Sequence, residues 1–331
     1  MGFYQIISFN SISFYLTNFM ISSFTRQFIR AGASAAFLVI ATSSFTTVRA
    51  HGAAGGESLE AGEFKASPVM TIEGHAGLED NLEGQPRHYA IDLQFGGVFE
   101  WGLENDGAFA IEALIGPAAV YGEAEHFYGR VEIEEEGEEE EEEESGAPYR
   151  RVDAKAYLAA RYQPNDRFSI SVDWKPYYVT SSIAEDTKGL KHEVGAKLAY
   201  AFGDGDLNFA LGDGLESIAD GIFISAENRS GWESDGTYLG NYTDTWLGFG
   251  FNVDLLNVTL TGGPRFYTPG DYSGLSQRTD WGGEIALEYP INDQVVLFAH
   301  WEPIYSTDER KGGGWGIGWQ HHIGTGVSFS F

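Results

Sequence analysis

The chain ends on the stretch Lys311–Phe331, which reads Lys-Gly-Gly-Gly-Trp-Gly-Ile-Gly-Trp-Gln-His-His-Ile-Gly-Thr-Gly-Val-Ser-Phe-Ser-Phe. From Trp315 onward every second residue is bulky and mostly apolar, and the residues between them are small or polar. A period of two predicts a β-strand, because successive side chains point to opposite faces. This sorting predicts that one face meets an apolar medium and the other a polar interior, as on a strand of a transmembrane β-barrel.

The same two-faced alternation recurs through residues 63–331. In residues 88–101 it is cleanest, with Tyr89, Ile91, Leu93, Phe95, Phe99 and Trp101 on one face and His88, Asp92, Gln94 and Glu100 on the other. Short turn signals stand at 103–107, 163–166, 203–206, 252–255 and 290–293, and longer polar stretches separate them. Aromatic residues gather at the ends of the expected strands, as interfacial girdles require. The prediction is an all-β, antiparallel transmembrane β-barrel of about twelve strands, with ten to fourteen allowed.

The uncertainty in the strand count comes from residues 207–232. There, Asp213–Asp220 fits a short helix or an elaborate turn, and Gly221–Arg229 fits the strand. A loop is expected near Asp235–Tyr242, before the next strand.

The last residues also resemble a known signal. Gly326, Phe329 and the terminal Phe331 are similar to the carboxyl-terminal recognition strand of bacterial outer-membrane β-barrel proteins, in which a Gly and two spaced hydrophobic residues end the chain on an aromatic. Gly324 departs from this pattern, since a polar residue is usual two positions before the Gly. The resemblance implies a porin-like protein of the cell outer membrane, with membrane lipid and the barrel assembly machinery as partners.

Residues 1–50 are expected to be a signal peptide that carries the chain across the inner membrane. Arg26 and Arg30 precede an apolar segment, Ala31–Ala41, and Val48-Arg49-Ala50 fits a cleavage site. The residues before Met20 carry no positive charge, which points to Met20 as the true start. Residues 51–62 would then form a flexible mature amino terminus.

Charge and cysteine usage narrow the function classes. The signal segment holds three of the 20 basic residues and none of the 49 acids, so the mature chain would carry 49 acids against 17 bases. Such a balance disfavours nucleic acids and favours cationic partners. The chain has no Cys, so disulfides and thiolate chemistry are excluded.

A run of eleven Glu within residues 132–144 dominates an acidic loop expected at about 129–148, in the second external connection. So many like charges repel one another and stay solvated, so disorder is expected. Carboxylates suit Ca²⁺ and Mg²⁺, and a nearby imidazole suits Zn²⁺, so these divalent cations are the candidate ligands. The candidate cation-binding residues are Glu123, Glu125, His126, Glu132, Glu134, Glu135, Glu136, Glu138, Glu139 and Glu140.

A second candidate site is the face that the alternation turns toward the lumen. Its acidic and histidine members are Glu73, His75, His88, Asp92, Glu112, Asp173, Glu193, Asp280, Glu284, Glu288, His300, Glu302 and His322. Its basic members are Lys155, Arg161, Lys175, Lys197 and Arg265. These charges either pair and plug a narrow barrel, or line an aqueous path whose acidic excess favours cations.

No catalytic residues are predicted. The His-x-Ser-Asn-Gly motif of barrel phospholipases is absent, and His321 and His322 face opposite sides of a strand. The expected function is a passive, cation-favouring channel for small solutes or metal ions. A non-conducting surface barrel whose Glu-rich loop binds cations or a partner is the alternative, and a barrel enzyme with a rim active site is the third.

Overall fold

The computed structural model describes residues 59–79, 87–122, 150–180, 189–203, 206–208, 218–271, 277–307 and 317–331. The predicted signal peptide and Glu-rich loop lie outside the described residues, as does most of the predicted flexible amino terminus. Within the described part, no helix is long and apolar enough to cross a membrane.

The described residues form thirteen strands. Their bounds are β1 Phe64–Glu79, β2 Arg87–Gly102, β3 Ala108–Gly122, β4 Arg150–Asn165, β5 Phe168–Val179, β6 Gly189–Ala201, β7 Asp206–Asn208, β8 Ile218–Glu233, β9 Tyr238–Val253, β10 Leu256–Pro269, β11 Arg278–Asn292, β12 Val295–Ser306 and β13 Gly318–Ser330.

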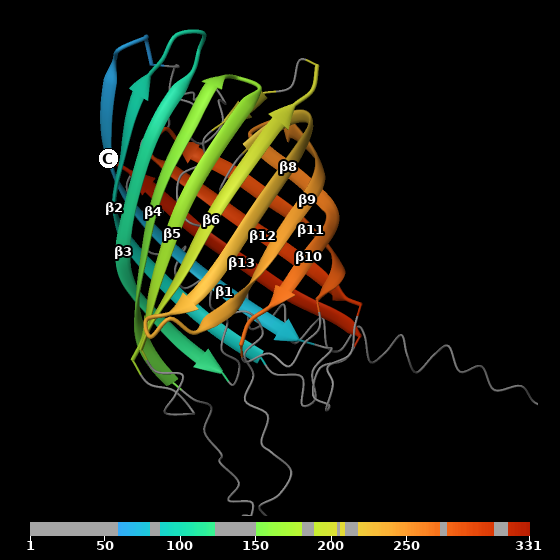
Figure 1. Ribbon diagram of the computed structural model, residues 1–331. Helices are drawn as coiled ribbons and strands as arrows, with labels where there is room; N and C mark the ends of the chain where they lie inside the picture. Colours follow the sequence, from blue (N-terminus) through green and yellow to red (C-terminus); the bar gives the residue numbers. More distant parts are fainter. Residues whose placement is uncertain are drawn as a thin grey trace, which may run out of the picture. The chain divides into compact units, whose positions relative to one another are not determined.

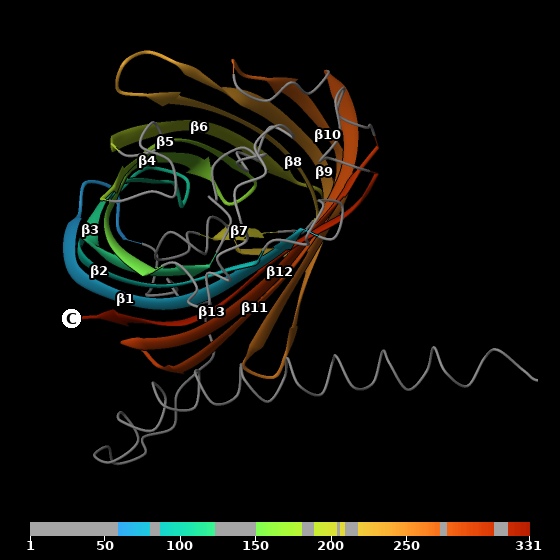
Figure 2. The same ribbon diagram turned by 90° about the horizontal axis from the view of Figure 1, so that it is seen from below.

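Twelve of these strands close into an antiparallel barrel (Figures 1 and 2). Each long strand pairs with its neighbours in the chain, β6 pairs with β8, and β13 returns to β1 with Val69 opposite Ser330. The three-residue β7 pairs with the start of β8. Closure satisfies the backbone hydrogen bonds that open sheet edges would leave unpaired in lipid. The predicted fold class and strand number are confirmed.

Three boundaries differ from the sequence prediction. Strand β8 begins at Ile218, so Ile218–Asp220 is neither helix nor turn. Strand β9 begins at Tyr238, inside the expected loop. Strand β10 extends to Pro269, into the Tyr- and Gly-rich segment 267–274 that the sequence assigns to a loop. In each case cross-strand pairing extends a strand into residues that polarity or Gly content had assigned to a connection.

The outer face of the barrel is apolar. Ile115, Leu247 and Phe331 leave 65%, 64% and 67% of their surface exposed, while Trp246, next to Leu247, leaves 9%. Exposed apolar side chains on this scale would be unfavourable in water, but they are what a lipid-facing surface requires. Aromatic pairs lie near the strand ends, among them Phe64 with Trp101 and Tyr305 with Trp319.

The same contact joins the two strands at the open ends of the hairpins β4–β5 and β11–β12. In the first, Asp153 accepts hydrogen bonds from the backbone N–H and the hydroxyl of Thr180. In the second, Asp280 accepts the equivalent bonds from Thr307, and both pairs are 27 residues apart. We call these two arrangements the Asp–Thr clasps.

The likeness between the two hairpins extends around each clasp. The Thr180 hydroxyl also donates to the Val152 carbonyl at 2.9 Å, and the Thr307 hydroxyl donates to the Thr279 carbonyl at 2.7 Å. An arginine two residues before each aspartate pairs with it, Arg151 in one hairpin and Arg278 in the other.

A Trp–His contact on the outer face repeats as well. The Trp174 indole donates to His192 Nδ1 at 3.2 Å, and the Trp301 indole donates to His321 Nδ1 at 3.4 Å. Each histidine stands opposite a proline of the neighbouring strand, His192 opposite Pro176 and His321 opposite Pro303. The three-strand units β4–β6 and β11–β13 are therefore built on one plan.

The clasps predict two matched losses of stability. Asp153→Ala leaves the Thr180 N–H without its acceptor, and Asp280→Ala does the same to Thr307. Each change also removes the carboxylate that pairs with a buried arginine, Arg151 or Arg278. The free energy of unfolding should therefore fall by about 3–5 kcal/mol, as when one partner of a buried ion pair is lost. Because the sites are far apart, the double variant should lose the sum.

Urea unfolding of the protein refolded in detergent micelles measures these values. The exposed Asp220→Ala change serves as the control and should leave the midpoint unchanged. Clasp variants that unfold at the wild-type urea concentration would contradict the stabilising role of the clasps.

Candidate functional site: the inner face of the barrel

The inner face of the barrel carries the charged side chains that the alternation turns away from lipid. The side chains of Arg151 and Arg278, 5% and 7% exposed, are buried against Asp153 and Asp280. Among the described residues, eight acidic and three basic residues are buried as whole residues. They are Glu73, Asp92, Glu112, Asp153, Asp173, Asp244, Asp280 and Glu288, and Arg161, Lys191 and Arg229. Charges removed from water require partners. The pairing of these side chains therefore decides which charges of the inner wall remain for binding an ion or a solute.

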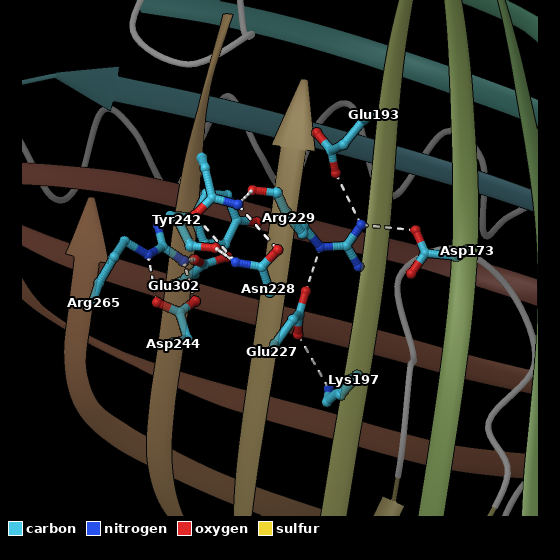
Figure 3. Close-up of polar contacts among 11 residues, drawn as sticks. Asp173, Glu193, Lys197, Glu227, Asn228, Arg229, Tyr242, Asp244, Arg265 and Glu302 are labelled. Atoms are coloured by element: carbon cyan, nitrogen blue, oxygen red, sulfur yellow. Dashed lines mark hydrogen bonds and ion pairs between the residues drawn. The ribbon is translucent and has the colours of Figure 1, made fainter. Parts of the chain in front are cut away.

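Arg229 on β8 is the centre of the first network (Figure 3). Its Nη1 lies 2.9 Å from Asp173 Oδ2 on β5 and 2.9 Å from Glu193 Oε1 on β6. Its Nε contacts Glu227, two residues earlier on the same strand, and Glu227 lies 3.6 Å from Lys197 Nζ. One guanidinium thus joins three carboxylates from three strands.

Arg265 on β10 is the centre of the second network (Figure 3). Its Nε and Nη2 donate to the two oxygens of Asp244 at 2.8 and 2.7 Å, which is the bidentate geometry of a strong pair. Its Nη2 also donates to Glu302 of β12 at 2.9 Å, and its guanidinium lies 4.2 Å from the centre of the Tyr242 ring. The Tyr242 ring therefore covers one face of this cation.

Further pairs continue the polar contacts around the wall. Lys155 on β4 lies 2.5 Å from Asp92 on β2, and Arg161 lies 3.4 Å from Glu112. Lys175 on β5 stands 5.5 Å from the centre of the Tyr157 ring on β4. The side chains that carry these contacts come from most strands of the ring.

Three histidines from neighbouring strands meet near the closure of the barrel. His322 Nε2 on β13 lies 3.5 Å from His75 Nδ1 on β1, and the His300 ring on β12 lies 5.2 Å from the His322 ring. His75 Nε2 lies 3.3 Å from Asp92, and His300 Nε2 lies 3.9 Å from Glu73. We call His75, His300 and His322 the histidine cluster.

Gly324 makes room for the histidine cluster. It stands opposite His75 on one side and His300 on the other. A Cβ at this position would meet the His300 ring and would lie 2.7 Å from the Glu73 carboxylate. Only a residue without a side chain lets these groups lie over β13, which is a reason for the glycine that departs from the expected recognition pattern.

Glu288 on β11 differs from the other buried carboxylates. It is 3% exposed, and neither of its oxygens has a hydrogen-bond partner among the described residues. Its backbone stands opposite Phe298 on β12 and Asn257 on β10. A buried carboxyl in such a place takes up either a proton or a cation.

Several residues that the sequence predicted for the lumen lie close together in the structure, and others lie outside the described residues. Glu73, His75, Asp92, His300 and His322 converge in one place. The side chain of His88 and all ten candidate cation-binding residues from Glu123 to Glu140 lie outside the described residues. Within the described part, no group of three or more His, Asp or Glu side chains is arranged to hold a metal ion.

Sequence reasoning missed Glu227, Arg229 and Asp244, which belong to the two arginine networks. The signal was present but weak. Phe223, Ser225, Glu227 and Arg229 alternate with Ile222, Ile224, Ala226 and Asn228, and the polar Asn228 on the outer face blurred the pattern. Asn228 there bonds to Asn241 and Thr243 of β9.

Comparison with known proteins supports the membrane assignment. Residues 210–331 match a family described as cyanophage outer membrane protein like β-barrel domain. No curated protein matches the chain. With its closed barrel and apolar outer face, the protein is an outer-membrane β-barrel, and the predicted resemblance and location are confirmed.

Several solved structures are similar in fold. The translocator domain of the autotransporter NalP from Neisseria meningitidis is 11% identical, with 80% of this chain and 88% of that chain covered and a TM-score of 0.43. An outer membrane channel from Pseudomonas putida F1 is 10% identical, with 83% and 98% covered and a TM-score of 0.46. The NanC porin is 10% identical, with 79% and 100% covered and a TM-score of 0.39.

The Arg229 network predicts a large effect of one substitution. Arg229→Ala leaves Asp173, Glu193 and Glu227 facing one another without the cation between them. The free energy of unfolding should fall by about 3–5 kcal/mol, as when one partner of a buried ion pair is removed. Urea unfolding in micelles measures it, with the exposed Arg167→Ala change as the control. Equal stability of the two variants would refute the structural role of Arg229.

Proposed function

We propose that the protein is a passive, porin-like channel that passes small solutes and favours cations over anions. The charged inner wall supports this proposal, since a barrel that served only as a rigid anchor would not need buried charge. Each buried carboxylate costs free energy of desolvation, and apolar residues of the same volume would stabilise the barrel at least as well.

The preference for cations rests on the imbalance of buried charge, and the observation that carries it is Glu288. In the described part of the wall eight carboxylates are buried against five basic side chains, those of Arg161, Lys191 and Arg229 with Arg151 and Arg278. Half-buried bases such as Lys155 and Arg265 neutralise several of the carboxylates. Glu288 has no such partner among the described residues, so it is the carboxyl of the inner wall that can exchange its proton for a cation from the lumen.

Conductance in a planar lipid bilayer tests the proposal. The purified protein should give discrete current steps, and under a KCl gradient the reversal potential should have the sign of a cation-selective pore. Glu288→Gln keeps the shape of the side chain and removes its ability to take up a cation, so it should shift the reversal potential toward that of a non-selective pore.

Glu104→Gln is the matched control, because Glu104 is exposed in the turn between β2 and β3. It removes the same charge from the chain without touching the inner wall, and it should leave the reversal potential unchanged. A folded protein that gives no current steps would refute the channel and favour the non-conducting surface barrel. Anion-selective reversal would refute the charge argument alone.

A further inference from the structure

We propose that the histidine cluster binds a first-row transition-metal ion of the Zn²⁺ and Cu²⁺ class, with His75 Nδ1 and His322 Nε2 as the two protein ligands. The site lies on the inner wall where β13 meets β1. As a binding site it stands independently of the channel, and as a station for a permeating ion it rests on the proposed function.

The distance between the two ring nitrogens carries the proposal. His75 Nδ1 and His322 Nε2 are 3.5 Å apart. Two nitrogens bound to one tetrahedral Zn²⁺ at about 2.0–2.1 Å lie about 3.3–3.4 Å from each other. Ring centres held by one such ion lie roughly 5 Å apart on the same geometry, and the two rings here are 5.4 Å apart. The distance between the two nitrogens therefore suits two ligands of one metal ion.

Asp92 supplies the second observation. It lies 3.3 Å from His75 Nε2, the nitrogen on the far side of the ring from His322. A carboxylate that accepts the second ring N–H of a ligating histidine fixes the tautomer and makes the ligating nitrogen more basic. The contact has the distance of an ion pair without the alignment of a hydrogen bond. A small rotation of the His75 ring would direct its Nε2 proton at Asp92 and the lone pair of Nδ1 toward a metal ion shared with His322. Asp92 is itself held by Lys155 at 2.5 Å.

His300 supplies a third, independent observation. It is 9% exposed, and its Nδ1 has no hydrogen-bond partner among the described residues. Buried polar atoms in native proteins are nearly always satisfied, so such an atom points to a missing ligand. The His300 ring, 5.2 Å from that of His322, would need a small shift to join the coordination of the same ion.

The type of site follows from the number of ligands. With two protein nitrogens in place, water must fill the remaining positions, so the ion stays exchangeable. Imidazole selects Zn²⁺, Cu²⁺ and Ni²⁺ over Ca²⁺ and Mg²⁺, which require oxygen ligands. Weak, selective binding is what passage through a pore requires.

The position along the barrel fits this use. His75 lies in the half of β1 that is away from its first residue, Phe64, and His322 lies in the half of β13 that is away from Phe331. At that same end β3 finishes and β4 begins, and the chain between them carries the eleven Glu of residues 132–144.

Metal titration of the full mature chain in micelles tests the site, with Zn²⁺ followed by calorimetry and Cu²⁺ by electron paramagnetic resonance. The Cu²⁺ spectrum should show at least two nitrogen ligands. His322→Gln and His75→Gln should each weaken this binding at least tenfold and remove one nitrogen from the spectrum.

His321→Gln is the matched control. His321 is the next residue along, on the outer face, where its ring lies against Trp301 and Trp319. It should bind both metals as the wild type does. Each variant retains the Glu-rich segment, so any binding there forms a common background. Heat-dependent migration on a gel verifies that each variant is folded. If His322→Gln does not fold, the result for His75→Gln decides whether the site exists.

The result that overturns the site is unchanged affinity and nitrogen count in both folded inner-wall variants, or an equal loss in His321→Gln. The metal titration needs no conduction. A protein that binds the ion but gives no current steps would refute the channel and retain the site. A conducting protein without the two-nitrogen signal would refute the site and retain the channel.

Discussion

The whole structure depends on the requirement that backbone N–H and C=O groups be paired where no water reaches them. An open sheet of twelve strands would leave two edges unpaired, at a cost of several kcal/mol per buried group. Pairing of β1 with β13 removes both edges. It also joins the carboxyl end of the chain to the first strand of the barrel, since the Phe331 N–H donates to the Pro68 carbonyl. The last strand closes the ring. Closure then places the side chains of each strand alternately in lipid and in the barrel interior.

Once the ring is closed, the environments impose opposite demands. Lipid on the outside accepts apolar side chains at no cost, so Ile115 and Leu247 stand exposed there. The inside receives the polar residues, and their charges are too close together to be left to water. Arg229 and Arg265 meet this demand by bridging carboxylates from several strands. Glu288 has no basic partner among the described residues, and the histidine cluster offers ring nitrogens. At these two places the inner wall can take up a cation.

The alternation of residues predicted the barrel because each strand records its two environments directly in its sequence, as residues 88–101 do for β2. It failed where outward residues are polar, as at Asn228 and Ser230 on β8, so Arg229 went unrecognised. It also says nothing of register between strands. His75 and His322 are separated by 247 residues in the sequence, and Asp173 and Arg229 are separated by 56. Which inner residues meet is decided by strand pairing, and alternation within a strand carries no information about it.

The repeated plan of β4–β6 and β11–β13 separates frame from function. The residues that agree in both units hold the structure: the Asp–Thr clasp, the preceding arginine, and the Trp–His contact opposite a proline. The inward residues around the repeated Trp differ. Asp173 and Lys175 flank Trp174, whereas His300 and Glu302 flank Trp301. Asp173 serves the Arg229 network, but His300 belongs to the histidine cluster and Glu302 faces Arg265. Two similar frames thus present different chemistry to one lumen, so the residues that differ between them are where selectivity for a solute has to be sought.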